Sequence, residues 1–441
     1  MSPVNKREVN NKTVRSTKPG TSGRTDKPAR NSAAPVKKSP DLIRKKGTSL
    51  SISKSQGTII RLIGEVDRPF LVIVVALLCI GSVMIFSASY AFAENEFNDS
   101  YYFARKQLGW VVAGLAIMGF VAKFVDYRWI KKWAFVGYIF SLVLNFLVPV
   151  IGVEVKGAIR QVDLGFINFQ PSELMKFFVI LILAAYVSDN HAQIRTFRKG
   201  VMPFIIFGGM AAASIMVQRH LSATIIICLI VLVMMYLSGT KGIWVGGALG
   251  AGVAAVAFVL TGTGREVLGK LVPHAVKRLQ VWEDPIAYMR DAETNWGGWQ
   301  PSQSLFAISS GGFWGLGLGQ SIEKYGYLPE PQNDYIFAIL CEELGFFGAT
   351  MVIGLFIAFA WRGFKIAKNA PNRFTSLLVM GITSQVVLQV ILNIAVVTNT
   401  IPSTGIGLPF FSYGGTNLII LLAEMGIILS ISRYSYLEKG Q

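Results

Sequence analysis

The stretch YLPEPQNDYIFAILCEELG, residues 327–345, places three carboxylates where acid–base chemistry is possible. Asp334 lies between a proline-containing loop and an apolar segment, where a carboxylate can reach a polar headgroup and accept a proton. The alternative role is structural, because Asn333 or Asp334 would make a natural N-cap for a following helix. Glu342 and Glu343 lie deeper in the apolar segment. Unpaired carboxylates are costly there, so we expect both to make structural hydrogen bonds inside the protein.

A second group of polar residues lies in KGAIRQVDLGFINFQPSELMKF, residues 156–177. Lys156 and Arg160 are candidates to hold a pyrophosphate, although each could equally be an ordinary interfacial cation. Ser172 is placed to cap the apolar helix that follows it. Glu173 and Lys176 are three residues apart on one face of that helix. They either form a satisfied pair or line a polar cavity.

The third polar stretch, GIGLPFFSYGGTNL (405–418), carries no charge. Its Ser412, Tyr413 and Asn417 could offer hydrogen bonds to a sugar, or the stretch could be a packed turn. No metal site is evident, because the three histidines lie far apart and the three cysteines fall in apolar runs. Those cysteines are better explained as small buried hydrophobic residues.

Composition indicates the elements that must position these residues. The chain has 441 residues, of which 52% are hydrophobic and only 15% charged, with a mean hydropathy of +0.49. A soluble domain carries about 25% charged residues, so we predict an all-α polytopic membrane protein. Windows of about 20 apolar residues predict ten transmembrane helices. They lie near residues 70–92, 107–125, 133–152, 172–188, 201–218, 221–239, 242–262, 335–361, 376–398 and 415–434.

Loop charges predict the orientation of these helices. Basic loops at 123–133, 194–200 and 361–373 alternate onto one side, and the acidic loop 94–100 lies on the other. The positive-inside rule then makes both termini cytoplasmic. One large extracellular loop, residues 263–334, follows between spans seven and eight. Its tryptophans and glycines suit a segment at headgroup level whose backbone approaches a ligand closely.

Residues 1–64 form a separate region, which we predict to be a disordered basic cytoplasmic tail. Within residues 1–57 there are 14 lysines and arginines against 3 acidic residues, so most of the net charge of +17 lies there. The tail is rich in Ser, Thr, Pro, Asn and Gly and nearly lacks aromatic residues, which is typical of disorder. No aromatic side chains that could stack on bases are interleaved with its basic residues, so we do not expect the tail to bind nucleic acid. Anionic lipid, or otherwise a docking partner, fits this charge better.

Three stretches together resemble hallmarks of the SEDS family, the shape, elongation, division and sporulation proteins. They are KGAIRQVDLGFINFQPSELMK, GLGLGQSIEKYGYLPEPQNDYIFAILCEELG and GLPFFSYGGTN, and they occur in the family's order. The second resembles the divisional branch, and the likeness covers residues 65–437. The resemblance implies an inverting glycosyltransferase that polymerises lipid II into peptidoglycan at the outer face of a bacterial cytoplasmic membrane, at the division septum.

The resemblance also implies site residues. The family's essential carboxylate falls on Asp334, which would act as the general base. The family's arginine falls on Arg160, which would offset the charge on the pyrophosphate with Lys156 and a divalent cation, Mg or Mn. The other residues that we expect to contact the substrate are Glu173, Lys176, Ser412 and Tyr413.

Two positions depart from the family's pattern. Gln161 replaces a usual tryptophan, and His220, in QRHLSAT, replaces a usual acid, so no acid–base role is carried over to His220. The expected partners are a class B penicillin-binding protein and other membrane proteins of the divisome. Two rival functions remain open at this point: a lipid II flippase, and a non-catalytic scaffold that activates its transpeptidase.

Overall fold

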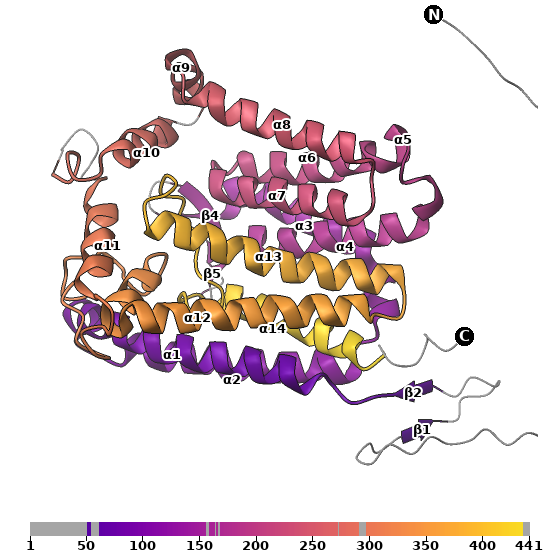
Figure 1. Cartoon of the computed structure of the whole chain (residues 1–441), viewed down its shortest axis with the longest axis horizontal. Helices are drawn as coiled ribbons and strands as arrows, with labels where there is room; N and C mark the ends of the chain where they lie inside the picture. The colour runs from indigo at the N-terminus through magenta and orange to yellow at the C-terminus, as the bar shows by residue number, and fades with distance from the viewer. Residues whose placement is uncertain are drawn as a thin grey trace, which may run out of the picture. The chain divides into compact units, whose positions relative to one another are not determined.

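The structure is a computed structural model. It describes residues 51–53, 61–155, 158–163, 165, 168–271, 273–290 and 297–434. All ten predicted apolar segments are helices in it (Figure 1). They are α1 (Arg68–Phe97), α2 (Tyr102–Phe124), α3 (Tyr127–Ile151), α4 (Pro171–Asp189), α6 (Met202–Met216), α7 (Leu221–Leu237), α8 (Gly242–Val259), α12 (Ile336–Lys368), α13 (Arg373–Val397) and α14 (Gly415–Ser432).

The prediction of a polytopic helical membrane protein is confirmed. Nine helical segments within the described ranges are long and apolar enough to cross a membrane. The remaining span, α7, is a shorter apolar helix of 17 residues. The predicted span at 201–218 corresponds to α5 (Phe197–Gly200) together with α6.

Short elements surround these helices. Antiparallel strands β3 (Val153–Val155), β4 (Ala158–Asp163) and β5 (Asn168–Phe169) precede α4, with β4 in the middle and Val162 opposite Phe169. The predicted large loop holds α9 (Gly262–Leu271), α10 (Pro273–Glu283) and α11 (Trp299–Ser310). A 3-10 turn, His191–Gln193, follows α4. Within the predicted tail, β1 (Ser51–Ser53) pairs with β2 (Arg61–Ile63), and the tail up to residue 50 lies outside the described residues.

The helices pack around α4, α13 and α14, whose side chains are largely buried. Glycines allow the closest approaches. A Cβ added at Gly426 of α14 would lie 2.7 Å from the carbonyl oxygen of Met118 in α2. Small residues let membrane helices approach closely, which strengthens van der Waals packing where lipid supplies no hydrophobic drive. Helix α8 differs, because none of its residues is buried.

Two ends of the bundle can be told apart. At one end, Asp67 caps α1 and accepts hydrogen bonds from Arg362 near the end of α12, at 2.7 and 2.8 Å. Gly64 also donates to the carbonyl of Arg433, so the chain enters α1 and leaves α14 at this end. Strands β4 and β5 and the loop before α12 lie at the opposite end, which holds the site described below (Figure 1).

Helix α12 is interrupted at Gly345, whose φ and ψ are 65° and −170°. The glycine-rich segment 311–317 packs into this break. Leu316 donates to the carbonyl of Glu342, and Phe346 donates to that of Gly312, both at 2.9 Å. A Cβ on Gly345 would lie 2.3 Å from the amide nitrogen of Gly315. Gly311 and Gly315 therefore lie against the backbone of α12, and the expectation that glycines of this loop serve contact with a ligand stays a prediction.

The break in α12 requires a glycine at position 345. Gly345→Ala should destabilise the protein by about 2 kcal/mol or more, because alanine is strained at this positive φ and its Cβ meets backbone. The measurement is the midpoint of thermal unfolding of the purified protein in detergent. Gly354→Ala is the control, since a Cβ there meets no atom within 4 Å. An equal effect of the two variants would contradict this account.

Candidate functional site

A cavity of about 990 Å³ opens at the end of the bundle that carries β4 and β5. Its wall comes from α2, strands β4 and β5, α4, the corner between α6 and α7 with the start of α7, the loop before α12, α13, and residues 405–417. The structure thus brings together seven of the eight predicted site residues, namely Asp334, Arg160, Glu173, Lys176, Ser412, Tyr413 and Asn417. The eighth, Lys156, lies outside the described residues.

Asp334 lies in the cavity wall just before α12. Asn393 of α13 donates to the backbone oxygens of both Asp334 and Ile406, at 2.7 Å each. On the other side, a Cβ added at Gly405 would lie 3.3 Å from an Asp334 carboxylate oxygen. The prediction that Asn333 or Asp334 caps α12 is wrong, because the N-cap residue is Tyr335 and no side chain bonds there. The position of this carboxylate is therefore set by contacts with α13 and the 405–413 turn.

Ser412 supports the same piece of chain. Its hydroxyl donates to the carbonyl of Asn333 at 2.8 Å and accepts from the amide of Leu408 at 2.6 Å. The amide of Tyr413 donates to the carbonyl of Gln332 at 2.9 Å. The 405–413 turn is thus a packed turn that holds residues 332–334. Because its single proton is already donated, Ser412 could only accept a hydrogen bond from a sugar. The substrate contacts of Ser412 and Tyr413 remain predictions.

Arg160 of β4 is half-buried and faces mixed electrostatics. Burial lowers the pKa of Arg160, the guanidinium of Arg278 lowers it further, and the carboxylate of Asp334 opposes both. Arg278 reaches this region from α10, where it donates to the carbonyl of Ser403 at 3.2 Å. Arg160, Arg278 and Asp334 thus interact electrostatically across one end of the bundle.

Glu173 and Lys176 form an ion pair of 2.7 Å, and both line the cavity. The spacing of these residues predicted either a satisfied ion pair or a role in lining a polar cavity. Both predictions are confirmed. The lysine side chain is only 2% exposed and the glutamate 14%, so the pair lies at the buried side of the wall. Ser172 is not the helix cap. The N-cap position belongs to Gln170, whose amide donates to the Ser172 hydroxyl at 3.1 Å.

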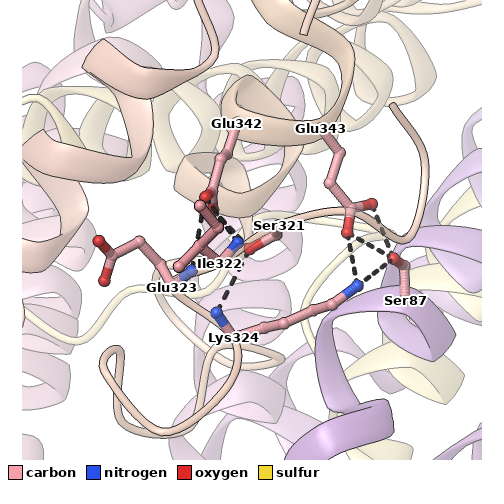
Figure 2. A network of polar contacts seen from close by, with 7 residues as sticks. All are labelled: Ser87, Ser321, Ile322, Glu323, Lys324, Glu342 and Glu343. Carbon is pink, nitrogen blue, oxygen red and sulfur yellow. Dashed lines mark hydrogen bonds and ion pairs between the residues drawn. The ribbon is translucent and has the colours of Figure 1, made fainter. Parts of the chain in front are cut away.

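The two deep glutamates have the structural role predicted for them (Figure 2). Glu343 pairs with Lys324 at 2.9 Å and accepts from Ser87 of α1 at 2.7 Å. Glu342 accepts from the hydroxyl of Ser321 and from the amide of Ile322, the latter at 2.8 Å. The contacts with Lys324, Ser321 and Ile322 join α12 to the segment 321–324 of the large loop, and the contact with Ser87 joins it to α1. That segment and α12 lie on either side of Asp334 in the chain, so these bonds fix both ends of the stretch that contains it.

Sequence reasoning missed several cavity residues. Arg105, Lys106 and Trp110 line it from α2, and Gln389 lines it from α13. A signal existed for the first two, because two adjacent cations follow the acidic loop 94–100 on the side where the positive-inside rule leaves few. No local pattern distinguishes Gln389 from a polar residue that packs between helices.

A divalent cation finds no ready ligand set here. Searched within the described ranges, the chain contains no group of three or more His, Cys, Asp or Glu side chains placed to hold a metal ion. The residues present therefore do not fit a metal held by the protein alone, and the Mg or Mn suggested by resemblance stays a prediction.

Known proteins resemble this chain over most of its length. Residues 68–437 match the model of the family of FtsW, RodA and SpoVE, described as cell cycle protein. The chain belongs to this family. It is 38% identical to stage V sporulation protein E of Bacillus subtilis, over 84% of this chain and 97% of that protein. It is 36% identical to a probable peptidoglycan glycosyltransferase FtsW of a Geobacter species, over 83% and 96% of the two chains.

Solved structures share the fold of this FtsW/RodA/SpoVE chain. A chain from a peptidoglycan synthase complex that coordinates polymerization and crosslinking superposes with a TM-score of 0.67 at 24% identity, covering 84% of this chain and 99% of that one. The rod shape determining protein RodA of Thermus thermophilus gives a TM-score of 0.61 at 23% identity, covering 84% and 98%. This chain therefore shares its overall helical fold with these solved structures.

Glu323 lies beside the deep glutamates (Figure 2). Burial, with a further contribution from the Glu342 carboxylate, raises the pKa of Glu323 to about 7. Because the folded pKa lies above the unfolded value, the protein loses stability as pH rises from about 4.5 to about 7, and the loss is complete above that range.

Glu323→Gln should therefore raise the midpoint of thermal unfolding by a few degrees at pH 8 and leave it unchanged at pH 4. The measurement is a set of melting curves in detergent between these pH values. Glu283→Gln, at a more exposed carboxylate on α10, is the control. A gain that is constant across the pH range would show that ionisation of Glu323 is not its cause.

Proposed function

We propose that this protein is an inverting glycosyltransferase that polymerises lipid II into glycan strands of peptidoglycan. The observation that carries the proposal is the cavity at one end of the membrane bundle, where Asp334 and Arg160 interact electrostatically and the Glu173–Lys176 pair lines the wall. It is further supported by near-full-length relatives that are named probable peptidoglycan glycosyltransferases.

The chemistry needs one base and an anion site. Asp334 accepts the proton from the 4-hydroxyl of the acceptor sugar, and that oxygen attacks the anomeric carbon of the lipid-linked chain from the face opposite its leaving group. The bond to the pyrophosphate breaks, the configuration inverts, and undecaprenyl pyrophosphate departs. Pyrophosphate is a good leaving group that needs no general acid, unlike the leaving alcohol in glycoside hydrolysis, where two carboxylates are usual. Arg160 and Lys176 stabilise its developing charge.

Positioning of the base supports this mechanism. The backbone of residues 332–334 is held by Tyr413, Ser412 and Asn393 from two other segments. A carboxylate on a backbone fixed in this way is already oriented before the substrate arrives, which lowers the entropy lost on reaching the transition state. The long polyprenyl tail of the substrate would remain in the lipid beside the bundle.

We place the cavity at the outer face of the cytoplasmic membrane and both termini in the cytoplasm. In support, the chain enters α1 and leaves α14 at the end opposite the cavity, and the basic loops gather by the positive-inside rule on the side of the termini. Divisional relatives named FtsW favour action at the septum.

A class B penicillin-binding protein is the proposed partner, together with other divisome membrane proteins. The structural neighbour from a complex that couples polymerization with crosslinking supports a paired transpeptidase. Such a partner would crosslink the strands that this protein makes.

Asp334→Asn should reduce polymerisation at least about 100-fold, since the amide cannot accept the proton that general base catalysis removes. The measurement supplies labelled lipid II in detergent to the purified protein and its cognate penicillin-binding protein, with the transpeptidase blocked by a β-lactam. Glycan length is then read on a gel.

Glu283→Gln on α10 is the matched control, because Glu283 pairs with Arg265 and does not line the cavity. Substantial polymer from the pure Asp334→Asn protein would refute the base assignment. If wild type bound lipid II but made no polymer, headgroup access from both sides of proteoliposomes would test the flippase, and activation of the transpeptidase would test the scaffold.

A further inference from the structure

His220 is a buried histidine in the cavity wall, at the corner between α6 and α7. It lines the cavity, yet only 6% of it is exposed. Its backbone neighbours are fixed on both sides. The Gln218 amide donates to the backbone oxygen of Asn145 at 2.8 Å, and the Ser222 hydroxyl donates to the carbonyl of Thr404. The chain on both sides of His220 is therefore tied to α3 and to the turn that leads to Gly405.

Positive charge surrounds this imidazole. Burial lowers the pKa of His220 to about 3, and Arg160 of β4, Lys176 of α4 and Arg278 of α10 act in the same direction. Glu173 offsets Lys176 through their ion pair. At neutral pH the ring is thus uncharged and offers one N–H donor and one lone pair.

The ring also has an unused hydrogen-bonding atom. Its Nδ1 is buried and has no hydrogen-bond partner among the described residues. A buried polar atom without a partner is destabilising, and such atoms in a native structure call for an explanation. Because His220 lines the cavity, a ligand bound in the cavity is the candidate to supply the missing hydrogen bond.

We propose that His220 is a neutral hydrogen-bond donor in a subsite for a diphosphate, which it shares with Arg160 and Lys176. This inference rests on the proposed function, which requires a diphosphate in the cavity. The two cations supply attraction for any anion, whereas a single N–H on a fixed ring is directional and selects where a phosphate oxygen lies. His220 binds and positions the diphosphate and transfers no proton to it, since the N–H of an uncharged imidazole is too weak an acid to be released near neutral pH.

The test measures binding without polymerisation. Inorganic pyrophosphate is titrated into the purified full-length protein in detergent, and its affinity is read from the shift in thermal unfolding. Undecaprenyl pyrophosphate, added in the same detergent, forms a second arm. His220→Leu should weaken binding in both arms by about tenfold or more, as expected for a lost hydrogen bond to a charged group. His220→Gln keeps an N–H donor and should retain part of the affinity.

His191→Leu is the matched control, because His191 is an exposed histidine beside Arg373 and does not line the cavity. Unfolding curves without ligand show whether each variant is folded, and the glutamine variant carries the test if the leucine variant is not. Weaker binding in the lipid-linked arm alone would still support the subsite and would assign it to lipid-linked diphosphate.

Unchanged affinity of the folded His220 variants in both arms, or wild-type protein that binds neither ligand, would overturn the proposal. A different result would contradict the proposed function and leave the diphosphate subsite intact. In that case no glycan forms from lipid II, while diphosphate binding still depends on His220.

Discussion

The need to compensate two carboxylates inside an apolar bundle governs much of this structure. Glu342 and Glu343 are essentially buried, and an uncompensated charge in such surroundings is strongly destabilising. Their partners come from the large loop, through Ser321 and Lys324, and from α1, through Ser87. The loop is consequently bound to the bundle by buried polar contacts. The break in α12 at Gly345 binds the loop to the bundle through the backbone as well, because it lets segment 311–317 form backbone hydrogen bonds with α12.

Asp334 depends on this arrangement, since it lies between the anchored segment and α12. A second set of contacts, from the 405–413 turn and Asn393, holds the backbone on each side of it. Most of these bonds are made by side chains or amides to backbone carbonyls, so they fix the chain without engaging the cavity. The carboxylate is thereby placed on a supported stretch of loop, which is the arrangement that preorganised chemistry requires.

The cavity separates charge in a way that suits a substrate with a neutral sugar and an anionic linker. Asp334 and Arg160 interact at one side, Lys176 is offset by Glu173, and His220 stays uncharged among the cations. Cations that are only partly offset in a site of reduced polarity attract phosphate strongly. The uncharged N–H of His220 beside these cations would in addition orient a phosphate oxygen, because a hydrogen bond is directional. In the proposed mechanism, binding of the diphosphate and base catalysis fall to different residues of one wall.

The ten helical segments, the membrane class and seven of the residues that line the cavity follow from the sequence alone. Hydropathy is a sum over consecutive residues, and the three family stretches are local strings, so neither depends on how the helices pack. Three features follow only from the folded arrangement. Lys324 pairs with Glu343, Tyr335 and not Asp334 is the N-cap of α12, and the Ser412 hydroxyl donates to a backbone carbonyl. These outcomes depend on distances between residues far apart in the chain, which no local pattern encodes.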